Sequence, residues 1–182
     1  MSAKPATIPP VVQTFILHWG ELGARWGINR TVAQIHALLY LSSEPLDAAV
    51  ISERLGIARS NASTSLRELQ GWGVVRVVHV LGDRRDHYEA VADVWEMFTT
   101  LAAARKRREI DPTLTVLKKC AAQLTSDTHA DPTVKARITA MLGLFETLTA
   151  LIDEMLRLPI AAIRGIAKLR GRLAPLLKGG RR

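Results

Sequence analysis

The chain has 182 residues, of which 48% are hydrophobic and 23% are charged, and it carries a formal net charge of +8 with a pI near 10.2. This length suits one compact domain with extensions, and the basic balance suits a nucleic-acid partner, although ribosomal and membrane-surface proteins share it. A single cysteine, Cys120, excludes an internal disulfide and a zinc site built from several cysteines, and a reducing cytoplasm is the compartment that we expect.

Several functional classes have no signature in the sequence. No apolar run is long enough to serve as a transmembrane segment, and prolines interrupt the first ten residues where a signal peptide would lie. Phosphate-binding glycine loops are missing, and the histidines are scattered without a paired metal-ligand spacing. No nucleophile with an adjacent base stands out. We therefore expect a protein that is not an enzyme, with no catalytic residues, no metal and no cofactor.

Residues 1–9 are predicted to form a flexible N-terminal arm, and residues 10–30 an N-terminal dimerisation helix. Apolar side chains advance by three and four positions and form a heptad-like stripe: Val12, Phe15, Trp19, Leu22 and Trp26. One helix cannot bury this stripe alone, so we expect it to pack against another helix of this chain or of a partner. The predicted dimer contacts of this helix are Val12, Phe15, Trp19 and Leu22.

Residues 31–92 are predicted to form a winged helix-turn-helix. Its first helix is expected to begin at Thr31 with a capping box and to bury Ile35, Leu38 and Leu39. The next helix should begin at Asp47, whose carboxylate can accept hydrogen bonds from the first turn, and should end at Gly56.

The helix after Gly56 carries the candidate reading surface. Its expected buried stripe is Ala58, Ala62, Leu66 and Leu69. The opposite face is polar and basic, which suits contact with base edges and phosphates in the major groove, and it consists of Arg59, Ser60, Asn61, Ser63, Thr64 and Arg67. The alternative for this helix alone is an ordinary solvated face.

A two-stranded β-wing is predicted to follow. The run from Val74 to Leu81 is rich in β-branched residues, Gly82 and Asp83 signal a turn, and residues 86–91 can return antiparallel. Arg84 and Arg85 then lie at the hairpin tip, where they are either solvated or placed to contact the DNA backbone or the minor groove.

The segment LGIARSNASTSLRELQGWGVVRVVHVLGDRRDHYEA, residues 55–90, resembles the DNA-binding core of the MarR superfamily of bacterial regulators. Within it, the pattern RSN-x-S-x-x-LREL-x-x-WG followed by a GDRR wing is similar to the GbsR-like branch. The resemblance covers about residues 12–110. It implies a homodimeric winged-helix transcription factor, usually a repressor, whose first and last helices form the dimer interface and whose DNA affinity is set by a small ligand. Ala58 departs from the family, which often has Ser or Thr there.

Residues 93–158 are predicted to form a C-terminal helical dimerisation region. Asp93 should cap a helix that ends in the cationic run of residues 105–108, where the charges either complement the helix dipole or contact phosphate. Asp111 and Asp131 each precede a proline, a pattern that begins a new helix or kinks a continuing one. From Val134 to Met155 a heptad seam predicts a coiled-coil contact, within the subunit or between subunits, and its predicted dimer contacts are Ile138, Met141, Phe145, Leu148 and Ile152.

Residues 159–182 form a basic tail with seven cationic residues and no acidic one. Its spacing permits a basic amphipathic helix, and a disordered solubilising tail is the alternative.

The fold class expected from these patterns is mainly α, a winged helix-turn-helix with a two-stranded β-wing and flanking dimerisation helices. The expected function is that of a sequence-specific transcriptional regulator, a repressor, which binds double-stranded DNA as a homodimer. The alternative is a winged-helix module that docks a protein or a membrane through its basic tail. Five aromatic residues, Trp19, Trp26, Tyr40, Trp72 and Trp95, motivate an aromatic cage for a small effector. The resemblance to the GbsR branch suggests a quaternary ammonium such as choline.

Overall fold

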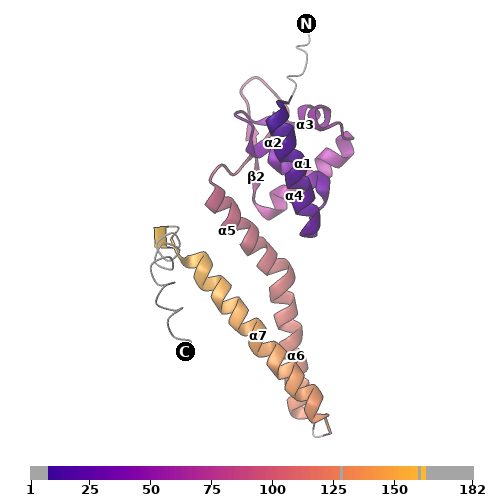
Figure 1. Cartoon of the computed structure of the whole chain (residues 1–182), viewed down its shortest axis with the longest axis vertical. Helices are drawn as coiled ribbons and strands as arrows, with labels where there is room; N and C mark the ends of the chain where they lie inside the picture. Colours follow the sequence, from indigo (N-terminus) through magenta and orange to yellow (C-terminus); the bar gives the residue numbers. More distant parts are fainter. Residues whose placement is uncertain (1–7, 128, 160, 163–182) are drawn as a thin grey trace, which may run out of the picture. The chain divides into compact units, whose positions relative to one another are not determined.

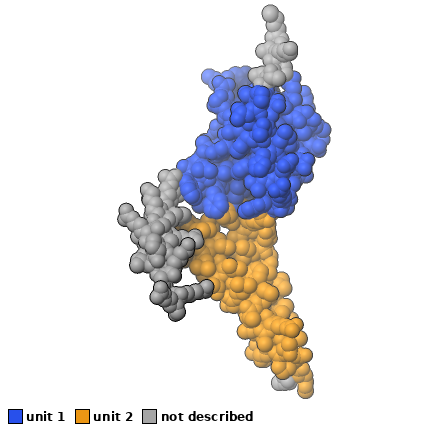
Figure 2. Space-filling model, viewed as in Figure 1, with its two compact units in different colours: residues 1–101 blue, residues 102–182 orange. Residues whose placement is uncertain are grey.

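The computed structural model describes residues 8–127, 129–159 and 161–162. The chain divides into two compact units, residues 1–101 and 102–182 (Figure 2). Secondary-structure elements of the first unit, seen in Figure 1, are α1 (Pro10–Arg25), α2 (Arg30–Tyr40), β1 (Leu46–Asp47), α3 (Ala48–Leu55), α4 (Arg59–Trp72), β2 (Val75–His79) and β3 (Asp86–Ala90). Helix α5 (Val94–Arg105) runs across the boundary at residue 101, and the second unit continues with η1 (Lys106–Ile110), α6 (Asp111–Ser126) and α7 (Pro132–Arg157).

Helix α1 packs against α2 through small residues rather than through the whole predicted stripe. Its buried positions are Ile16, Gly20 and Gly23, and a Cβ atom on Gly23 would lie only 2.6 Å from the Cβ atom of Ala33. The two backbones therefore approach closely because both glycines lack a side chain. Leu22 and Trp26 are exposed in the single chain, Trp26 by 62%, so of the two predicted alternatives a contact with a partner remains for them.

The remaining stripe residues of α1, namely Val12, Phe15 and Trp19, are half-buried against the core of the first unit.

Helix α2 supplies the centre of that core. Ile35, Leu38 and Leu39 are buried, as predicted. The start of α2 differs from the expectation by one residue, because the cap is Asn29 and not Thr31. The Asn29 carboxamide oxygen accepts a hydrogen bond from the backbone N–H of Thr31 at 2.8 Å, which satisfies a donor of the first turn.

Helices α3 and α4 form the predicted helix-turn-helix. The Asp47 carboxylate accepts from the N–H groups of Ala49 and Val50, and Gly56 ends α3 with a left-handed φ of 63°. On α4, Ala62, Leu66 and Leu69 are buried as predicted. The expectation that Ala58 is buried is wrong: it is exposed because it lies before the first helical residue, where helical spacing does not apply.

The wing pairs β2 with β3 antiparallel, with Val77 opposite Tyr88. A third strand, β1, also pairs with β3, so the sheet has the order β1-β3-β2 and the wing is not limited to the two predicted strands. Strand β1 is only two residues long, which is too short for an alternating sequence pattern to predict it. Its pairing fixes the base of the wing to the start of α3.

Helix α5 ends at Arg105, in the predicted cationic run of residues 105–108, but the backbone stays helical beyond it. After α5 the chain passes through the π-helical turn η1 straight into α6, and Asp111 itself is helical with φ −61° and ψ −41°. Pro112 cannot donate a backbone hydrogen bond to the residue four positions earlier, and the π-helical turn η1 lies just before this proline. The cations of residues 105–108 therefore lie within a continuous helical segment. The Lys106 ammonium pairs with the carboxylates of Asp111 at 2.9 Å and Asp153 at 3.2 Å.

Helix α7 begins at the predicted cap, Asp131, which accepts from the N–H of Thr133 at 2.7 Å. Its long apolar surface has two sides. One side packs against α6 and includes the half-buried residues Ile138, Leu142, Phe145, Thr149, Ile152 and Leu156. The other side is exposed and consists of Met141, Leu144, Leu148, Leu151, Met155 and Leu158. The single predicted seam took alternate residues from both sides.

The predicted basic tail lies outside the described residues except for 159, 161 and 162, and the predicted N-terminal arm lies outside them except for residues 8 and 9. Among the helices that the structure describes, none combines the length and hydropathy that crossing a bilayer would need.

Candidate nucleic-acid interface

Helix α4 presents a continuous polar and basic surface. All six residues predicted for this face are exposed: Arg59, Ser60, Asn61, Ser63, Thr64 and Arg67. They are held outward because Ala62, Leu66 and Leu69 anchor the opposite side in the core. Apart from a long hydrogen bond of 3.4 Å from Arg67 to the Thr64 hydroxyl, their side chains make no interactions with other described residues that would occupy them. The surface is therefore available to a partner.

The start of α4 has no side-chain cap. Ala58 occupies the N-cap position in an extended conformation, with φ −64° and ψ 143°, and cannot accept a hydrogen bond through its methyl group. The first backbone N–H groups of α4 therefore lack the side-chain acceptor that Asp47 supplies for α3. Uncapped N–H groups at a helix start, together with the helix dipole, favour an anion such as a phosphate.

At the wing tip the two arginines have different surroundings. The guanidinium of Arg85 binds both carboxylate oxygens of Asp83, and its Nη1 atom donates to Asp47. Because Asp47 also caps α3, Arg85 connects the tip of the hairpin to the helix-turn-helix. No hydrogen bond or ion pair within the described part of the chain involves the exposed Arg84.

The ion pairs of Arg85 are electrostatically strong for an exposed site. Hydrogen bonds from the Arg85 side chain and backbone hold the pKa of Asp83 well below its usual range. The hydrogen bond to Asp83 and the charge of Asp47 raise the pKa of Arg85 in turn. Asp83 and Arg85 therefore stay charged across the physiological range.

The link from Arg85 to Asp47 could not be predicted from the sequence. Asp47 was predicted only as a helix cap, and its second oxygen binds a residue 38 positions further along. His87 was also overlooked: it is buried under the wing tip, and its Nδ1 atom lies 3.0 Å from the carbonyl oxygen of Arg85. A Gly-Asp-Arg-Arg turn followed by a buried histidine is the only local signal, and it does not name the distant partner.

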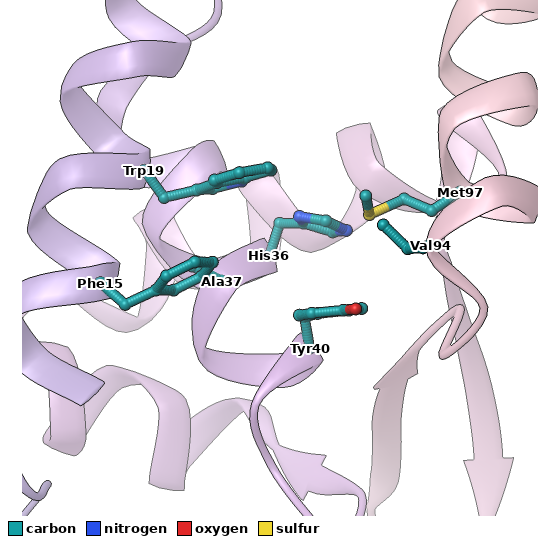
Figure 3. Close-up of a pocket in the computed structure, with 7 residues that line it drawn as sticks. All are labelled: Phe15, Trp19, His36, Ala37, Tyr40, Val94 and Met97. Atoms are coloured by element: carbon teal, nitrogen blue, oxygen red, sulfur yellow. The ribbon is translucent and has the colours of Figure 1, made fainter. Parts of the chain in front are cut away.

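A cavity of about 230 Å³ lies in the first unit between α1, α2 and the start of α5 (Figure 3). Its lining residues are Phe15, Trp19, His36, Ala37, Tyr40, Val94 and Met97. Of the five aromatics expected to form a cage, Trp19 and Tyr40 lie here, whereas Trp26, Trp72 and Trp95 do not line it. Phe15, predicted as a dimer contact, and His36 complete a row of four rings.

Comparisons with known proteins identify the fold of this region. Residues 26–86 match a family model described as MarR family. The chain is 25% identical over 145 residues to YvaV of Bacillus subtilis (strain 168), described as an HTH-type transcriptional regulator, covering 78% of this chain and 82% of YvaV. It is 22% identical over 121 residues to the HTH-type transcriptional repressor OpcR of the same organism, covering 65% of each chain.

The match to the HTH-type transcriptional repressor GbsR of Bacillus subtilis (strain 168) is shorter, with 25% identity over 99 residues and 54% of each chain covered. A solved crystal structure of a transcriptional regulator aligns with a TM-score of 0.67 at 18% identity, covering 81% of this chain and 96% of that one. This structural likeness shows the fold. Residues 26–86 therefore resemble the MarR family, and YvaV, OpcR and GbsR are each described as transcriptional regulators or repressors.

Proposed function

We propose that this protein is a sequence-specific repressor of transcription that acts as a homodimer in the cytoplasm, and that it is related to the GbsR-like branch. The observation that carries the proposal is the exposed front of α4, because six exposed polar or basic side chains project from one helix. Two of the curated relatives, OpcR and GbsR, are described as repressors, which favours repression over activation.

In this proposal the residues have separate roles on the duplex. Ser60, Asn61, Ser63 and Thr64 read base edges in the major groove, while Arg59 and Arg67 at the margins of the helix contact phosphates. Arg84 contacts the backbone or the minor groove from the wing tip. Arg85 approaches the same backbone, but its guanidinium is shared with Asp83 and Asp47, so we assign it mainly to fixing the wing.

The dimer interface is proposed to lie on the exposed apolar side of α7. Residues 141, 144, 148, 151, 155 and 158 form a heptad stripe that α6 leaves uncovered, and water contact with so many large apolar side chains is unfavourable. A second copy of the chain would cover this stripe. Ile138, Phe145 and Ile152, which were predicted as dimer contacts, face α6 instead and support the interface from behind. Val12, Phe15, Trp19 and Leu22 of α1 remain a predicted second part of the interface.

A small molecule bound in the cavity between α1, α2 and the start of α5 is proposed to set the DNA affinity. Residues of α2 line the cavity, and α2 packs directly against α4. A shift of α2 on ligand binding would therefore move α4 as well. A quaternary ammonium such as choline is the ligand that the GbsR resemblance predicts, but the proposal of ligand control does not depend on that chemical class.

Footprinting on the DNA upstream of the protein's own gene tests the function. We expect protection of a two-fold symmetric site with half-sites about one helical turn apart, roughly 34 Å. Binding should keep its preference over random duplex as salt rises, because base contacts are less salt-dependent than phosphate contacts. Equal affinity for random and upstream DNA at every salt concentration would contradict the proposal.

A further inference from the structure

The cavity of the first unit is lined only by side chains that carry no charge at neutral pH. The lining residues are three aromatic rings, one imidazole and three aliphatic or thioether groups, and no carboxylate is among them. Its volume of about 230 Å³ is below the usual range of small-molecule sites, roughly 300–1,000 Å³. A ligand of this cavity must therefore be small.

His36 provides an unsatisfied polar group beside this apolar cavity. The residue is only 4% exposed, and its Nε2 atom is buried without a hydrogen-bond partner among the described residues. In Figure 3 the imidazole lies between the rings of Trp19 and Tyr40, and its outer edge faces Met97. A buried polar atom without a partner destabilises the protein, so a ligand that supplies a hydrogen bond here removes a penalty that the free protein carries.

A positive charge is disfavoured at this place. Burial lowers the pKa of His36 from 6.5 to about 4, so the imidazole is neutral under physiological conditions. The lowered pKa of His36 shows that its surroundings destabilise a positive charge on the imidazole. A bound quaternary ammonium would meet the same desolvation cost, and cation–π attraction would offset only part of it.

The aromatic rings are also stacked rather than arranged as a cage. Phe15 and Trp19 have ring centroids 5.4 Å apart with an interplanar angle of 18°. Trp19 and His36 are 6.4 Å apart at 28°, and His36 and Tyr40 are 6.3 Å apart at 23°. Successive rings are therefore nearly parallel, whereas a cage needs faces that surround the cation from several directions.

We infer that this cavity binds a small uncharged molecule, with an apolar body against the rings and one hydroxyl or similar group bonded to the Nε2 atom of His36, in preference to a quaternary ammonium. Since a hydroxyl both donates and accepts, it satisfies either tautomer of the imidazole. Met97 covers the nitrogen, and its unbranched, flexible side chain can move aside to admit the ligand. The inference rests on the proposed ligand control of DNA binding and names the chemical class of that ligand.

The experiment compares choline with its carbon isostere, the alcohol in which a tert-butyl group replaces the trimethylammonium group. The two compounds share their shape and hydroxyl and differ in charge. Titration calorimetry and tryptophan fluorescence on the full chain without DNA should give the alcohol a dissociation constant at least about tenfold lower, which corresponds to about 1.4 kcal/mol. Binding of choline as tightly as the alcohol, or of neither compound at millimolar concentration, overturns the inference.

Three variants locate the bound alcohol. Val94→Phe fills the cavity from a half-exposed lining position and should abolish binding, whereas Val11→Phe, at an exposed position outside the cavity, should leave it unchanged. His36→Phe keeps a flat ring and removes the nitrogen, and it should weaken binding by about fivefold, close to the worth of one hydrogen bond. Unchanged binding by Val94→Phe would overturn the site, and unchanged binding by His36→Phe would overturn the role of the nitrogen. Circular dichroism checks that each variant is folded.

Operator affinity measured in parallel separates this inference from the proposed function. If the alcohol binds in the cavity but leaves operator affinity unchanged, the proposed ligand control fails and the ligand class stands. If operator affinity responds to choline alone, ligand control stands and the ligand class fails.

Discussion

Asn61 and Arg84 differ in what their side chains can recognise. Asn61 is exposed in the first turn of α4, and its carboxamide can pair with two edge atoms of an adenine. Arg84 is exposed at the wing tip, where a guanidinium binds phosphate or a narrow minor groove without reading a unique base pattern.

Substitution of these two residues should therefore have different consequences. Asn61→Ala is expected to lower the discrimination between operator and random duplex by about 1–3 kcal/mol. Arg84→Ala should weaken binding to both by a similar factor and reduce the salt dependence. Competition binding assays at several salt concentrations measure both quantities. A loss in Asn61→Ala that is equal for operator and random DNA would exclude direct base reading by this residue.

His36 makes stability dependent on pH. Its folded-state pKa is lowered from 6.5 to about 4, so the unfolded chain takes up a proton that the folded chain resists. Stability is therefore unaffected above pH 6.5 and falls as the pH drops from 6.5 towards 4, by about 3 kcal/mol in total.

His36→Phe should remove this slope. Urea unfolding of wild type and variant at a series of pH values gives the difference in their free energies of unfolding, in which the other titrating groups cancel. A difference that stays constant between pH 7 and pH 4.5 would show that the proton is accepted without cost.

The wing owes its position to a few long-range contacts. β1 pairs with β3 through Leu46 and Tyr88, and Arg85 joins Asp83 at the tip to Asp47 at the start of α3. Both connections hold the hairpin against the helix-turn-helix, so they set where Arg84 can reach.

Arg85→Gln should loosen the wing without unfolding the first unit. The variant loses the ion pairs to Asp83 and Asp47 but keeps the sheet, so we expect only a small loss of stability, because solvent screens the exposed guanidinium of Arg85. Faster amide hydrogen exchange at residues 80–86 and weaker operator binding should follow. If exchange at the wing tip is unchanged while DNA affinity falls, Arg85 acts on DNA directly and not by fixing the wing.

The contact between α1 and α2 depends on the missing side chain of Gly23. A Cβ atom there would lie 2.6 Å from the Cβ atom of Ala33, which cannot rotate away, so the helices must separate.

Gly23→Ala should therefore destabilise the first unit by about 1–3 kcal/mol, the usual cost of overpacking. Gly71→Ala is the matched control, because nothing lies within 4 Å of a Cβ atom at this helical position. Its expected effect is a stabilisation of about 0.4–1 kcal/mol through lower entropy of the unfolded chain. Thermal unfolding of both variants measures the two changes in stability. Equal effects of the two substitutions would contradict the close packing of α1 on α2.

The two sides of α7 lead to a prediction about assembly. Leu148 is 40% exposed on the uncovered apolar side, whereas Phe145 is half-buried against α6. Leu148→Asp should split the dimer and leave the helices intact, while Phe145→Asp should disrupt the packing of α6 on α7.

Thr139→Asp, exposed and off both apolar sides of α7, is the control and should stay dimeric. Sedimentation measures the mass, circular dichroism the helix content, and a binding assay the operator affinity. The monomeric variant should lose operator binding almost completely, because a single winged helix-turn-helix contacts only one half-site. A Leu148→Asp protein that remains dimeric would place the interface elsewhere.

Local sequence signals were enough to predict the helix-turn-helix and its wing. Asp47 and Gly56 bound α3, buried Ala62, Leu66 and Leu69 orient α4, and Gly82 turns the wing. Each of these signals acts within a few residues, through a cap, a helical period or a left-handed backbone, so the sequence alone determined them. For the same reason all six predicted positions on the front of α4 proved to be exposed.

Contacts between distant segments could not be predicted in this way. The pairing of β1, the link from Arg85 to Asp47 and the ring stack around His36 each join residues from elements far apart in the chain. The predicted seam of α7 combined residues from two different sides of the helix. The two heptad stripes lie only one or two positions apart in the sequence, and only the packing of α6 against one of them distinguishes the two. The sequence determined which helices and turns form, whereas the tertiary structure decided which side chains are covered and which remain free to bind, since burial depends on neighbours that local periodicity does not specify.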